Sequence, residues 1–486
     1  MKHLFVANRG EIALRIIRTA HRIGLTTTLA AHAVDLKSVA SQAASQTAQI
    51  FGDPPVAAYL DIPQLIQTAL DRGCDAVHPG YGFLSENEAF AAQVEAAGLC
   101  WVGPSPSLID LMGDKIRARE FAHRCGLPLV PFALDSSDEE FREAVLALGL
   151  PVLIKAAAGG GGKGIKIVRR EADLAGAIAR ARSEALRYFG DDRIYAERYV
   201  ERPRHIEVQI LADGFGKTLH LGERECSIQR RFQKIIEEAP SVAVDRDLRS
   251  KICGAAVSLA KAAKYRNAGT VEFILGPERE FYFLEMNTRL QVEHPVTEFV
   301  TGLDLVEWQL RIASGEALPF EQSDIASNGH AIECRINAED VRSGFVPSSG
   351  TIARYIEPEG EGVRVDSGVR ELDQLTSAFD PMLAKLIVWG PDRASANMRA
   401  EVALRNFCLL GPETNIAYLR ALLKQPEYIS GHIDTGFIDL HQEEVIQRMQ
   451  AESLLDVEVA AAFVALTLPE ALVPYSRLAE LGAWKN

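Results

Sequence analysis

Cysteine pairs, long apolar runs and an excess of positive charge are all missing from this sequence. The seven cysteines are odd in number and none are spaced as Cys-x-x-Cys, which excludes a disulfide framework and a zinc site. We therefore expect reduced thiols and a cytoplasmic protein. No stretch reaches the roughly 20 apolar residues of a membrane span. Lys and Arg number 52 against 66 Asp and Glu, and this net charge of −14 argues against nucleic acid or membrane partners.

A dinucleotide-binding fingerprint is absent as well. The first predicted strand, residues 3–7, is followed by Asn8-Arg9-Gly10-Glu11 and not by Gly-x-Gly-x-x-Gly. Apolar residues then recur at helical spacing up to Ile23, and strands and helices alternate as far as residue 113. This alternation predicts an open parallel α/β domain without a dinucleotide site.

The length of 486 residues suggests about three domains in a protein of mixed α/β and α+β class. Beyond residue 113 the strands are predicted to pair antiparallel, for example residues 206–211 with 218–221. We expect four segments: 1–113, 114–315 with a lid at about 128–200, 329–441, and a helical, polar tail over 442–486.

Four consecutive glycines, Gly159 to Gly162, lie between two predicted strands with Lys155 before them and Lys163 after them. A tip of this kind can present bare backbone N–H groups to an anion. It differs from a Walker loop because a lysine precedes the glycines and a strand follows them. The alternative is a flexible surface hairpin, but the flanking lysines favour a phosphate-binding lid.

A second predicted hairpin joins residues 271–275 to 281–285. A symmetric register places Glu272 directly opposite Glu285, and such like charges destabilise a sheet by up to about 1 kcal/mol. The pair is tolerable at a surface, or it is held by a divalent cation. Hard oxygen ligands beside phosphates favour Mg²⁺ or Mn²⁺.

Polar and apolar residues alternate beyond this hairpin. If residues 285–293 are extended, five polar groups share one face with spacings of about 6–7 Å: Glu285, Asn287, Arg289, Gln291 and Glu293. The alternative is a half-exposed edge strand. The opposite face is apolar, and the polar face holds a cation among carboxylates. This pattern favours a site in which metal ligands, an anion-binding group and a general base follow one another along one substrate.

Other charged residues are ambiguous when each is taken alone. The basic segment 229–234 is most often a solvated face, and His78 and His205 are more typical of structural histidines. Three lysines with two arginines would suit a nucleotide and a second anion, although spacing alone cannot bring them together: Lys115, Lys155, Lys234, Arg289 and Arg335.

Taken together, these residues resemble the biotin carboxylase family of the ATP-grasp superfamily, over nearly all of residues 1–441. The branch that it resembles most is the α subunits of propionyl-, methylcrotonyl- and acetyl-CoA carboxylases. The matching motifs are long: residues 7–13, 78–87, 111–115, 285–295 and 333–340. Two departures are Phe232, where many members have a polar residue, and Ala158, where several bacterial members have glycine.

The resemblance implies a two-step ligase reaction, in which Mg-ATP phosphorylates bicarbonate to carboxyphosphate and biotin is then carboxylated. It implies these nucleotide contacts: Lys115, Lys155, Gly161, Gly162, Glu197, Arg198, Val200, His205, Gln229, Glu272 and Glu285. Two metal ions would be held by Glu272, Glu285 and Asn287. Bicarbonate would bind Lys234, Arg289, Gln291 and Val292, with Glu293 as general base. Biotin would bind Arg335 near Tyr81, and the catalytic set would be Arg289, Glu293, Lys234 and Arg335.

The same resemblance implies partners. These are a biotin carboxyl carrier protein or domain, a carboxyltransferase subunit and a second copy of the chain. No Met-Lys-Met occurs in the sequence, so we expect carrier-bound biotin supplied in trans and no covalent biotin on this chain. Two alternatives are another ATP-grasp ligase, which would not need Arg335 or the run 291–293, and a non-catalytic nucleotide-binding subunit. All metal carboxylates and Lys234 are present, which disfavours the latter.

Overall fold

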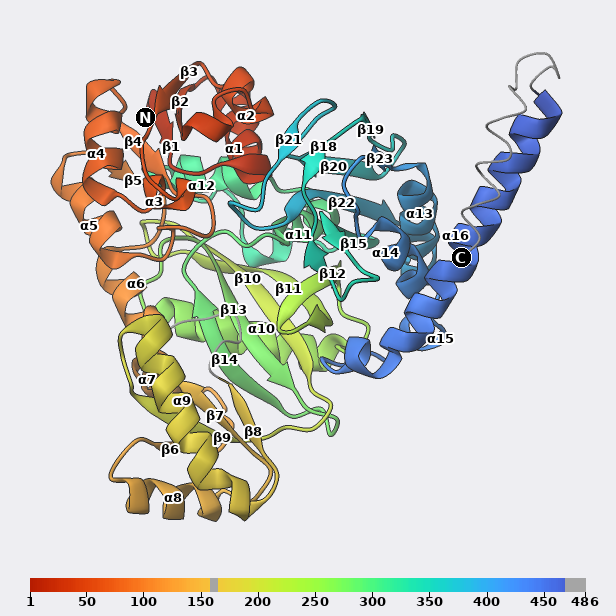
Figure 1. Cartoon of the computed structure of the whole chain (residues 1–486). Coiled ribbons are helices and arrows are strands. Elements are labelled where there is room, and N and C mark those ends of the chain that lie inside the picture. Colours follow the sequence, from red (N-terminus) through yellow and green to blue (C-terminus); the bar gives the residue numbers. More distant parts are fainter. Residues whose placement is uncertain (158–164, 468–486) are drawn as a thin grey trace.

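The computed structural model describes residues 1–157 and 165–467 (Figure 1). Its N-terminal part is a five-stranded parallel sheet in the order β3-β2-β1-β4-β5. The strands are β1 (His3–Val6), β2 (Thr26–Ala31), β3 (Gln46–Gln49), β4 (Ala76–His78) and β5 (Cys100–Trp101). The helices are α1 (Gly10–Arg22), α2 (Val39–Ala43), α3 (Pro55–Ala58), α4 (Ile62–Asp71), α5 (Glu88–Ala96) and α6 (Pro106–Gly113). Ile12, Ile16 and Ile17 of α1 are buried, as their helical spacing predicts.

A smaller lobe follows, at the bottom of Figure 1. It is a four-stranded antiparallel sheet in the order β6-β9-β7-β8, and Phe141, Val145 and Ile154 are fully buried in its core. Its strands are β6 (Phe132–Leu134), β7 (Val152–Ala156), β8 (Lys166–Val168) and β9 (Ile194–Arg198). Helix α7 (Lys115–Arg124) leads into the lobe, which also contains α8 (Asp138–Ala147) and α9 (Leu174–Phe189).

The centre of the molecule is one eight-stranded sheet, ordered β14-β13-β10-β11-β12-β15-β22-β20 and antiparallel throughout. Its strands are β10 (Arg204–Ala212), β11 (Thr218–Arg230), β12 (Gln233–Ala239), β13 (Asn267–Leu275), β14 (Phe281–Asn287), β15 (His330–Asn337), β20 (Val363–Ser367) and β22 (Met382–Gly390). The associated helices are α10 (Arg246–Ala262), α11 (His294–Thr301) and α12 (Leu305–Ala313). The predicted hairpin of residues 206–211 with 218–221 is present as β10 and β11.

The third predicted segment does not form a sheet of its own. Ile236 of β12 pairs with Cys334 of β15, and Ala239 pairs with Ala331, so the strands beyond residue 329 extend the central sheet. Hydrogen bonds therefore connect the middle of the chain directly to its C-terminal part. This sheet lets Lys234 and Arg335 lie on neighbouring strands although 100 residues separate them in sequence.

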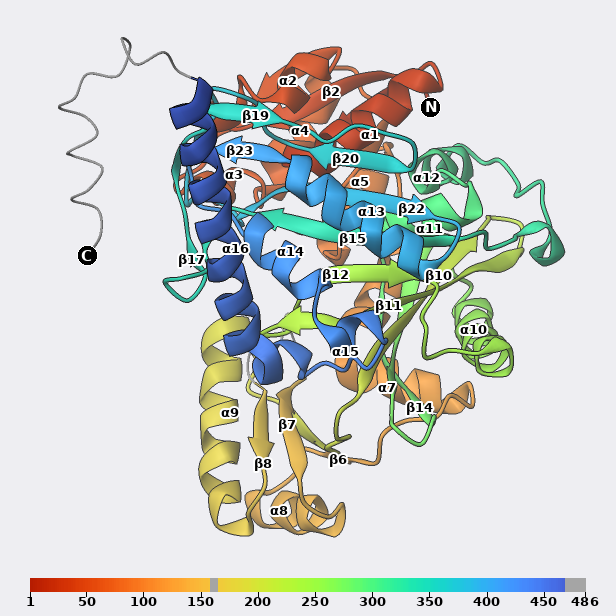
Figure 2. The same cartoon turned by 90° about the vertical axis from the view of Figure 1, so that its right-hand side faces the viewer.

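The C-terminal part packs helices against β15 and β22, on the right of Figure 1 and facing the viewer in Figure 2. The helices of this part are α13 (Arg393–Asn406), α14 (Ile416–Leu423), α15 (Pro426–Ile429) and α16 (Phe437–Thr467), of which α13 and α14 contact these strands. Short strands are β16 (Glu339–Asp340), β17 (Val346–Pro347), β18 (Gly350–Thr351), β19 (Arg354–Ile356), β21 (Gln374–Leu375) and β23 (Cys408–Leu410). Residues 442–467 of the expected helical tail belong to α16, which begins at Phe437, and residues 468–486 lie outside the described residues.

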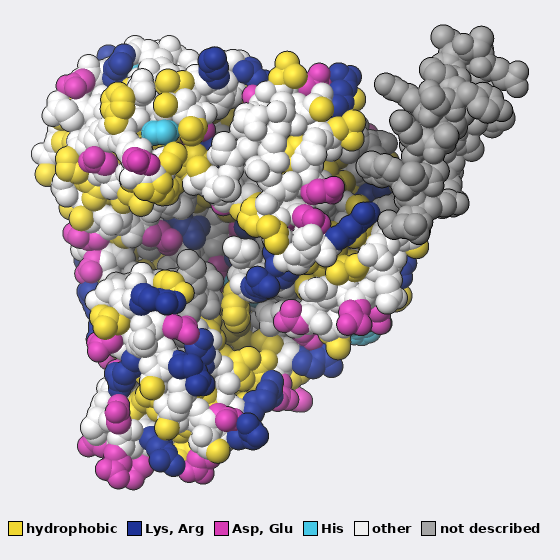
Figure 3. Space-filling view, in the orientation of Figure 1, with side chains coloured by type: hydrophobic (Ala, Val, Ile, Leu, Met, Phe, Trp, Pro, Cys, Tyr) yellow, Lys and Arg dark blue, Asp and Glu magenta, His cyan; other side chains and the backbone are white. Residues whose placement is uncertain are grey.

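Among the residues that the structure describes, no helix combines the length and apolar character needed to cross a bilayer. A recess separates the lower lobe from the body of the molecule, and Lys and Arg side chains gather on the lobe beside it (Figure 3).

Candidate active site

The two carboxylates predicted to face each other do so. Glu272 of β13 is the register partner of Glu285 of β14, and the pairing shifts just beyond them, where Phe273 pairs with Phe283. Each carboxylate also has a cation of its own. Lys115 Nζ lies 2.5 Å from Glu285, and Lys234 Nζ lies 3.1 Å from Glu272. These cations remove the repulsion that would otherwise destabilise the pair.

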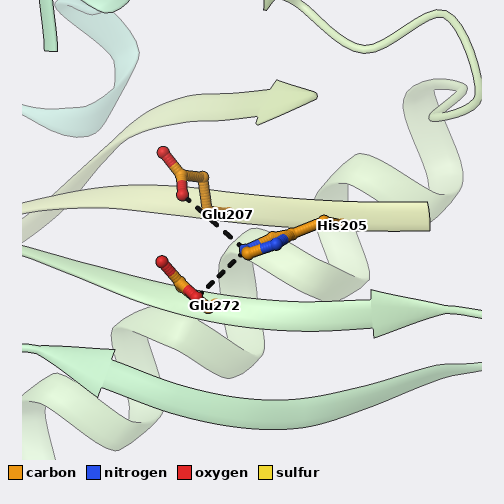
Figure 4. Close-up of side chains that lie close together, drawn as sticks. All are labelled: His205, Glu207 and Glu272. Atoms are coloured by element: carbon orange, nitrogen blue, oxygen red, sulfur yellow. Dashed lines mark ion pairs between the residues drawn. The ribbon is translucent and has the colours of Figure 1, made fainter. Parts of the chain in front are cut away.

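His205 lies beside this pair, on β10. Its Nε2 is 3.0 Å from Glu272 and 3.9 Å from Glu207, and all three side chains are buried (Figure 4). Burial lowers the pKa of His205, but the Glu272 carboxylate outweighs that effect and the net direction is upward. Gln229 donates to the other ring nitrogen, Nδ1, over 3.1 Å. His205 and Gln229, both predicted to contact the nucleotide, are therefore in direct contact.

Lys234 is the electrostatic centre of the site. Its Nζ lies 2.6 Å from Glu207, 3.1 Å from Glu272 and 2.5 Å from Glu293. Burial lowers the pKa of Lys234, yet the surrounding carboxylates raise it well above its ordinary value. A fixed ammonium among carboxylates is suited to receive an anion once one of these ion pairs opens.

Glu293, the predicted base, sits between two cations. Its Oε1 is 2.5 Å from Lys234, and its Oε2 is 2.9 Å from Arg335. Burial alone would raise the pKa of Glu293, but Lys234 and Arg335 outweigh it and hold the pKa well below its usual range. The carboxylate is therefore ionised at neutral pH and able to accept a proton.

The predicted extension of residues 285–293 is only partly right. Strand β14 ends at Asn287, and the chain turns before α11, which starts at His294 with Pro295 in its first turn. The polar side chains nevertheless converge on one place, because the turn folds them back over β13. Asn287 donates to Glu272 over 2.9 Å, and Gln291 donates to the same oxygen over 2.7 Å.

Arg289 is anchored from two directions. Its Nε donates to Glu86 of the N-terminal part over 2.8 Å, and its Nη2 donates to Asn287 over 3.0 Å. The guanidinium therefore bridges the parallel domain and the central sheet. Val292 is another predicted bicarbonate contact, and its carbonyl accepts from Lys385 Nζ over 2.9 Å.

The small lobe supplies a second lysine. Lys155 of β7 lies 2.5 Å from Glu197 of β9, and Arg119 of α7 pairs with the same carboxylate. The Glu197 side chain is thus occupied within the fold. Arg198 and Val200, the other predicted adenine contacts, lie at the end of β9 and just after it. Gly161 and Gly162 fall outside the described residues.

Arg335 is joined to the N-terminal part through Lys385. Arg335 donates to Glu237 through Nε over 2.6 Å, and its register partner on β22 is Lys385. The Lys385 Nζ is 3.3 Å from Glu11 and 6.0 Å from the centre of the Tyr81 ring, whose hydroxyl donates to Glu11. Tyr81 and Arg335, the two predicted biotin contacts, therefore lie around one lysine.

The position of Tyr81 depends on a close backbone approach. The Asn8 side chain donates to the carbonyls of Pro79 and Tyr81, over 2.6 and 2.8 Å. Gly80 between them has φ +63°, and a Cβ there would lie 2.8 Å from the Asn8 amide nitrogen. Glycine is required at this position on both counts.

Sequence reasoning missed several buried residues of the site. They are charged groups to which no role was assigned: Glu207, Arg224, Glu237 and Lys385. All four are fully buried. Glu207 pairs with the predicted Lys234 and Glu237 with the predicted Arg335, while Arg224 pairs with Glu207 and Lys385 with Glu11. Burial raises the pKa of Glu237 to about 7, although Arg335 acts in the opposite direction. The signal that the sequence offered was a charged residue within an otherwise apolar strand.

A divalent cation fits the donor set at the facing carboxylates. Glu272, Glu285 and Asn287 offer two carboxylates and an amide oxygen, which are hard ligands of the kind Mg²⁺ prefers. Lys115 of α7, the helix that leads into the small lobe, and Lys234 of the central sheet lie beside this pair. Buried lysines and facing carboxylates where a small antiparallel lobe meets a larger sheet define the class of protein as ATP-grasp.

Comparisons with known proteins agree with this class. Residues 1–109 match the biotin carboxylase N-terminal domain, residues 114–321 the ATP-binding domain of the carbamoyl-phosphate synthase L chain, and residues 333–440 the biotin carboxylase C-terminal domain. The biotin carboxylase of Nostoc sp. is 47% identical over 438 residues, covering 90% of this chain and 98% of that protein. The chain belongs to the biotin carboxylase family.

Longer relatives and solved structures extend the comparison. The mitochondrial methylcrotonoyl-CoA carboxylase subunit alpha of Glycine max is 44% identical over 97% of this chain, which spans 65% of that protein. The biotin carboxylase domain dimer of Hydrogenobacter thermophilus 2-oxoglutarate carboxylase, solved with MgADP and bicarbonate, is 43% identical with a TM-score of 0.89, covering 91% of this chain and 98% of that one. The Campylobacter jejuni biotin carboxylase complex with β,γ-ATP also has a TM-score of 0.89, at 40% identity, covering 90% and 99%. The predicted family and fold class are confirmed.

Proposed function

We propose that this chain is the biotin carboxylase of an acyl-CoA carboxylase, using Mg-ATP and bicarbonate to carboxylate biotin on a carrier. The observation that carries the proposal is Glu293, a buried carboxylate held between Lys234 and Arg335. A general base placed between two anion-binding cations suits a small anionic substrate that must lose a proton. Bicarbonate is such a substrate.

The nucleotide would lie between the small lobe and the central sheet. Lys115, Lys155 and His205 would neutralise its phosphates, and Glu272, Glu285 and Asn287 would hold the two metal ions. A bound Mg²⁺ or Mn²⁺ would supply charge stabilisation to the transferring phosphoryl group. Glu197, Arg198 and Val200 would line the adenine, with Gln229 behind His205.

Bicarbonate would bind at Lys234, Arg289, Gln291 and Val292. On binding, it would replace one carboxylate partner of Lys234 with its own oxygen. Glu293 would then take the bicarbonate proton, and the oxygen so freed would attack the γ-phosphorus, giving ADP and carboxyphosphate. Arg289 and Lys234 would stabilise the negative charge that develops.

Arg335, with Tyr81, would bind the ureido group of biotin. Carboxyphosphate would break down to CO₂ and phosphate, and the phosphate would take the ureido N–H proton. Arg335 would stabilise the resulting enolate until its nitrogen attacks CO₂, and Arg335 already touches the base Glu293. The partners that follow are a biotin carboxyl carrier, a carboxyltransferase subunit and a second copy of this chain. The named dimer among the similar structures supports the last of these. We place the protein in the cytoplasm.

The test is an ATP hydrolysis assay with bicarbonate and free biotin varied independently. We expect hydrolysis to require bicarbonate and to be stimulated by biotin, with carboxybiotin as the product. Hydrolysis that needs an amine or another carboxylate, and not bicarbonate, would instead identify a different ATP-grasp ligase. Nucleotide binding without turnover under any of these conditions would identify a regulatory subunit.

A further inference from the structure

Arg224 of β11 lies beneath the site, and none of its surface is exposed. An arginine side chain has five N–H donors, and each donor of Arg224 has its own acceptor. The acceptors come from two neighbouring strands, the segment after β14 and helix α11: Glu207 at 2.5 Å, Gln209 at 2.8 Å, Thr270 at 3.2 Å, Gln291 at 3.0 Å and Thr297 at 2.9 Å.

Two of these acceptors also face the reacting groups. Glu207 accepts from Arg224 with one oxygen and from Lys234 with the other, over 2.6 Å. Gln291 accepts from Arg224 with its carbonyl oxygen and donates its amide nitrogen to Glu272 over 2.7 Å. Arg224 thus touches both the residue that holds Lys234 and a residue of the bicarbonate pocket.

We propose that Arg224 is the positioning residue of the bicarbonate pocket, acting through Gln291 and Glu207; this rests on the function proposed above. A guanidinium has donors only, so the Gln291 amide must turn its oxygen toward Arg224. The amide NH₂ is then forced toward the substrate side, where an anion needs a donor. Without Arg224 the amide can rotate and present its oxygen, which repels bicarbonate.

Lysine cannot replace this arginine. Its ammonium has the same charge but three donors at a single point, whereas the acceptors of Arg224 surround a planar fork. Arg224→Lys therefore keeps the charge in the core and removes the geometry. Bicarbonate affinity is the quantity that should change, because ATP contacts lie on other side chains.

The experiment compares Arg224→Lys with Arg249→Lys in the bicarbonate-dependent ATPase assay. Arg249 is the matched control, because it makes two bonds of 2.7 Å to Glu223, the residue next to Arg224, and is on α10, away from the site. For Arg224→Lys we expect the KM for bicarbonate to rise at least about tenfold, the scale of one lost charge-assisted hydrogen bond, while the KM for ATP stays within about twofold. Arg249→Lys should change neither constant.

Two more variants keep the proposal testable if Arg224→Lys does not fold. Thr270→Val removes only the other acceptor of the nitrogen that binds Gln291, and should raise the KM for bicarbonate about two- to fivefold. Gln291→Glu keeps an acceptor for Arg224 and loses the NH₂ donor, so it should show the bicarbonate defect directly.

The outcomes separate the two proposals. A bicarbonate defect in Gln291→Glu, together with bicarbonate constants in Arg224→Lys and Thr270→Val that equal those of the control, overturns the role of Arg224 alone. Normal bicarbonate kinetics in Gln291→Glu overturns the proposed bicarbonate pocket itself. A defect in ATP and bicarbonate constants alike in Arg224→Lys also overturns the positioning role, because it indicates a general loss of structure.

Discussion

The Glu293 carboxylate lies 2.5 Å from the Lys234 ammonium, and these two residues are 59 positions apart in the sequence. The proposed base and the proposed anion-binding cation therefore neutralise each other in this structure. Bicarbonate can enter only by sharing or opening this pair. Opening it would free Glu293 from one cation and raise its basicity at the moment when a proton must be accepted.

Replacing Glu293 or Arg335 should separate the two half-reactions. Glu293→Gln removes the proton acceptor while keeping the shape, so bicarbonate-dependent ATP cleavage should fall by at least about a hundredfold with ATP affinity unchanged. Arg335→Met should reduce carboxybiotin formation more than ATP cleavage. Arg342→Met, on an exposed turn, is the control. Equal losses in both assays for both variants would contradict these separate roles.

Glu285→Gln tests the proposed metal pair. The amide keeps the size of the carboxylate but removes one negative ligand, so Mg-ATP turnover should fall by about two orders of magnitude or more. Raising the Mg²⁺ concentration should restore part of the loss. Glu278→Gln, an exposed glutamate in the turn of the same hairpin, should behave as the parent protein. Near-normal turnover of Glu285→Gln at ordinary Mg²⁺ would show that this carboxylate holds no essential ion.

The hairpin that carries the facing carboxylates could be predicted because it is local. The short turn pairs Phe273 with Phe283, a register that would continue to Leu284 opposite Glu272. The pairing shifts by one residue between Phe273 and Glu272, and this irregularity, not a symmetric register, brings Glu272 opposite Glu285. The continuation was harder, since alternation to Glu293 predicts a strand whereas the chain turns after Asn287 to begin α11. A pattern of period two does not reveal where a strand stops.

The charged residues around Lys234 could not be predicted. Glu207 and Arg224 come from β10 and β11, and Glu237 and Lys385 from strands that join only through the β12–β15 pairing. That pairing brings together segments about a hundred residues apart. Nothing local in the sequence specifies such a contact, because it depends on how the whole sheet is ordered.

Glu237 should make the stability of the protein depend on pH. Burial raises its pKa from 4.5 to about 7, so between these pH values the folded protein binds a proton that the unfolded chain does not. Stability is therefore lost as the pH rises through this window, by up to about 3 kcal/mol from this group. Glu237→Gln removes the titration, so its melting temperature should fall less than that of the parent between pH 5 and pH 8.

Thermal unfolding at several pH values measures this difference. Glu11, whose pKa burial also raises to about 7, contributes a similar slope to both proteins and cancels in the comparison. Glu359→Gln, on an exposed loop, should leave the slope of the parent unchanged. Identical slopes in Glu237→Gln and in the parent would mean that Glu237 is ionised throughout.

Glu197 should affect the stability of the small lobe and the KM for ATP, but not the preference for adenine over guanine. Its carboxylate is buried between Lys155 and Arg119. Burial alone would raise the pKa of Glu197, but the two cations outweigh burial and hold that pKa below its ordinary value. Glu197→Gln leaves two cations without a counter-charge, which should cost about 2 kcal/mol of stability and raise the KM for ATP through Lys155. The ratio of ATP to GTP usage should not change, because the Glu197 side chain is already occupied within the fold. Recognition of the adenine is then left to the backbone at the end of β9. Glu139→Gln, at an exposed position on α8 of the same lobe, is the control and should leave stability and the KM for ATP unchanged. A shift toward GTP in Glu197→Gln would show that the side chain itself reads the base, and that the ion pair with Lys155 opens when the nucleotide binds.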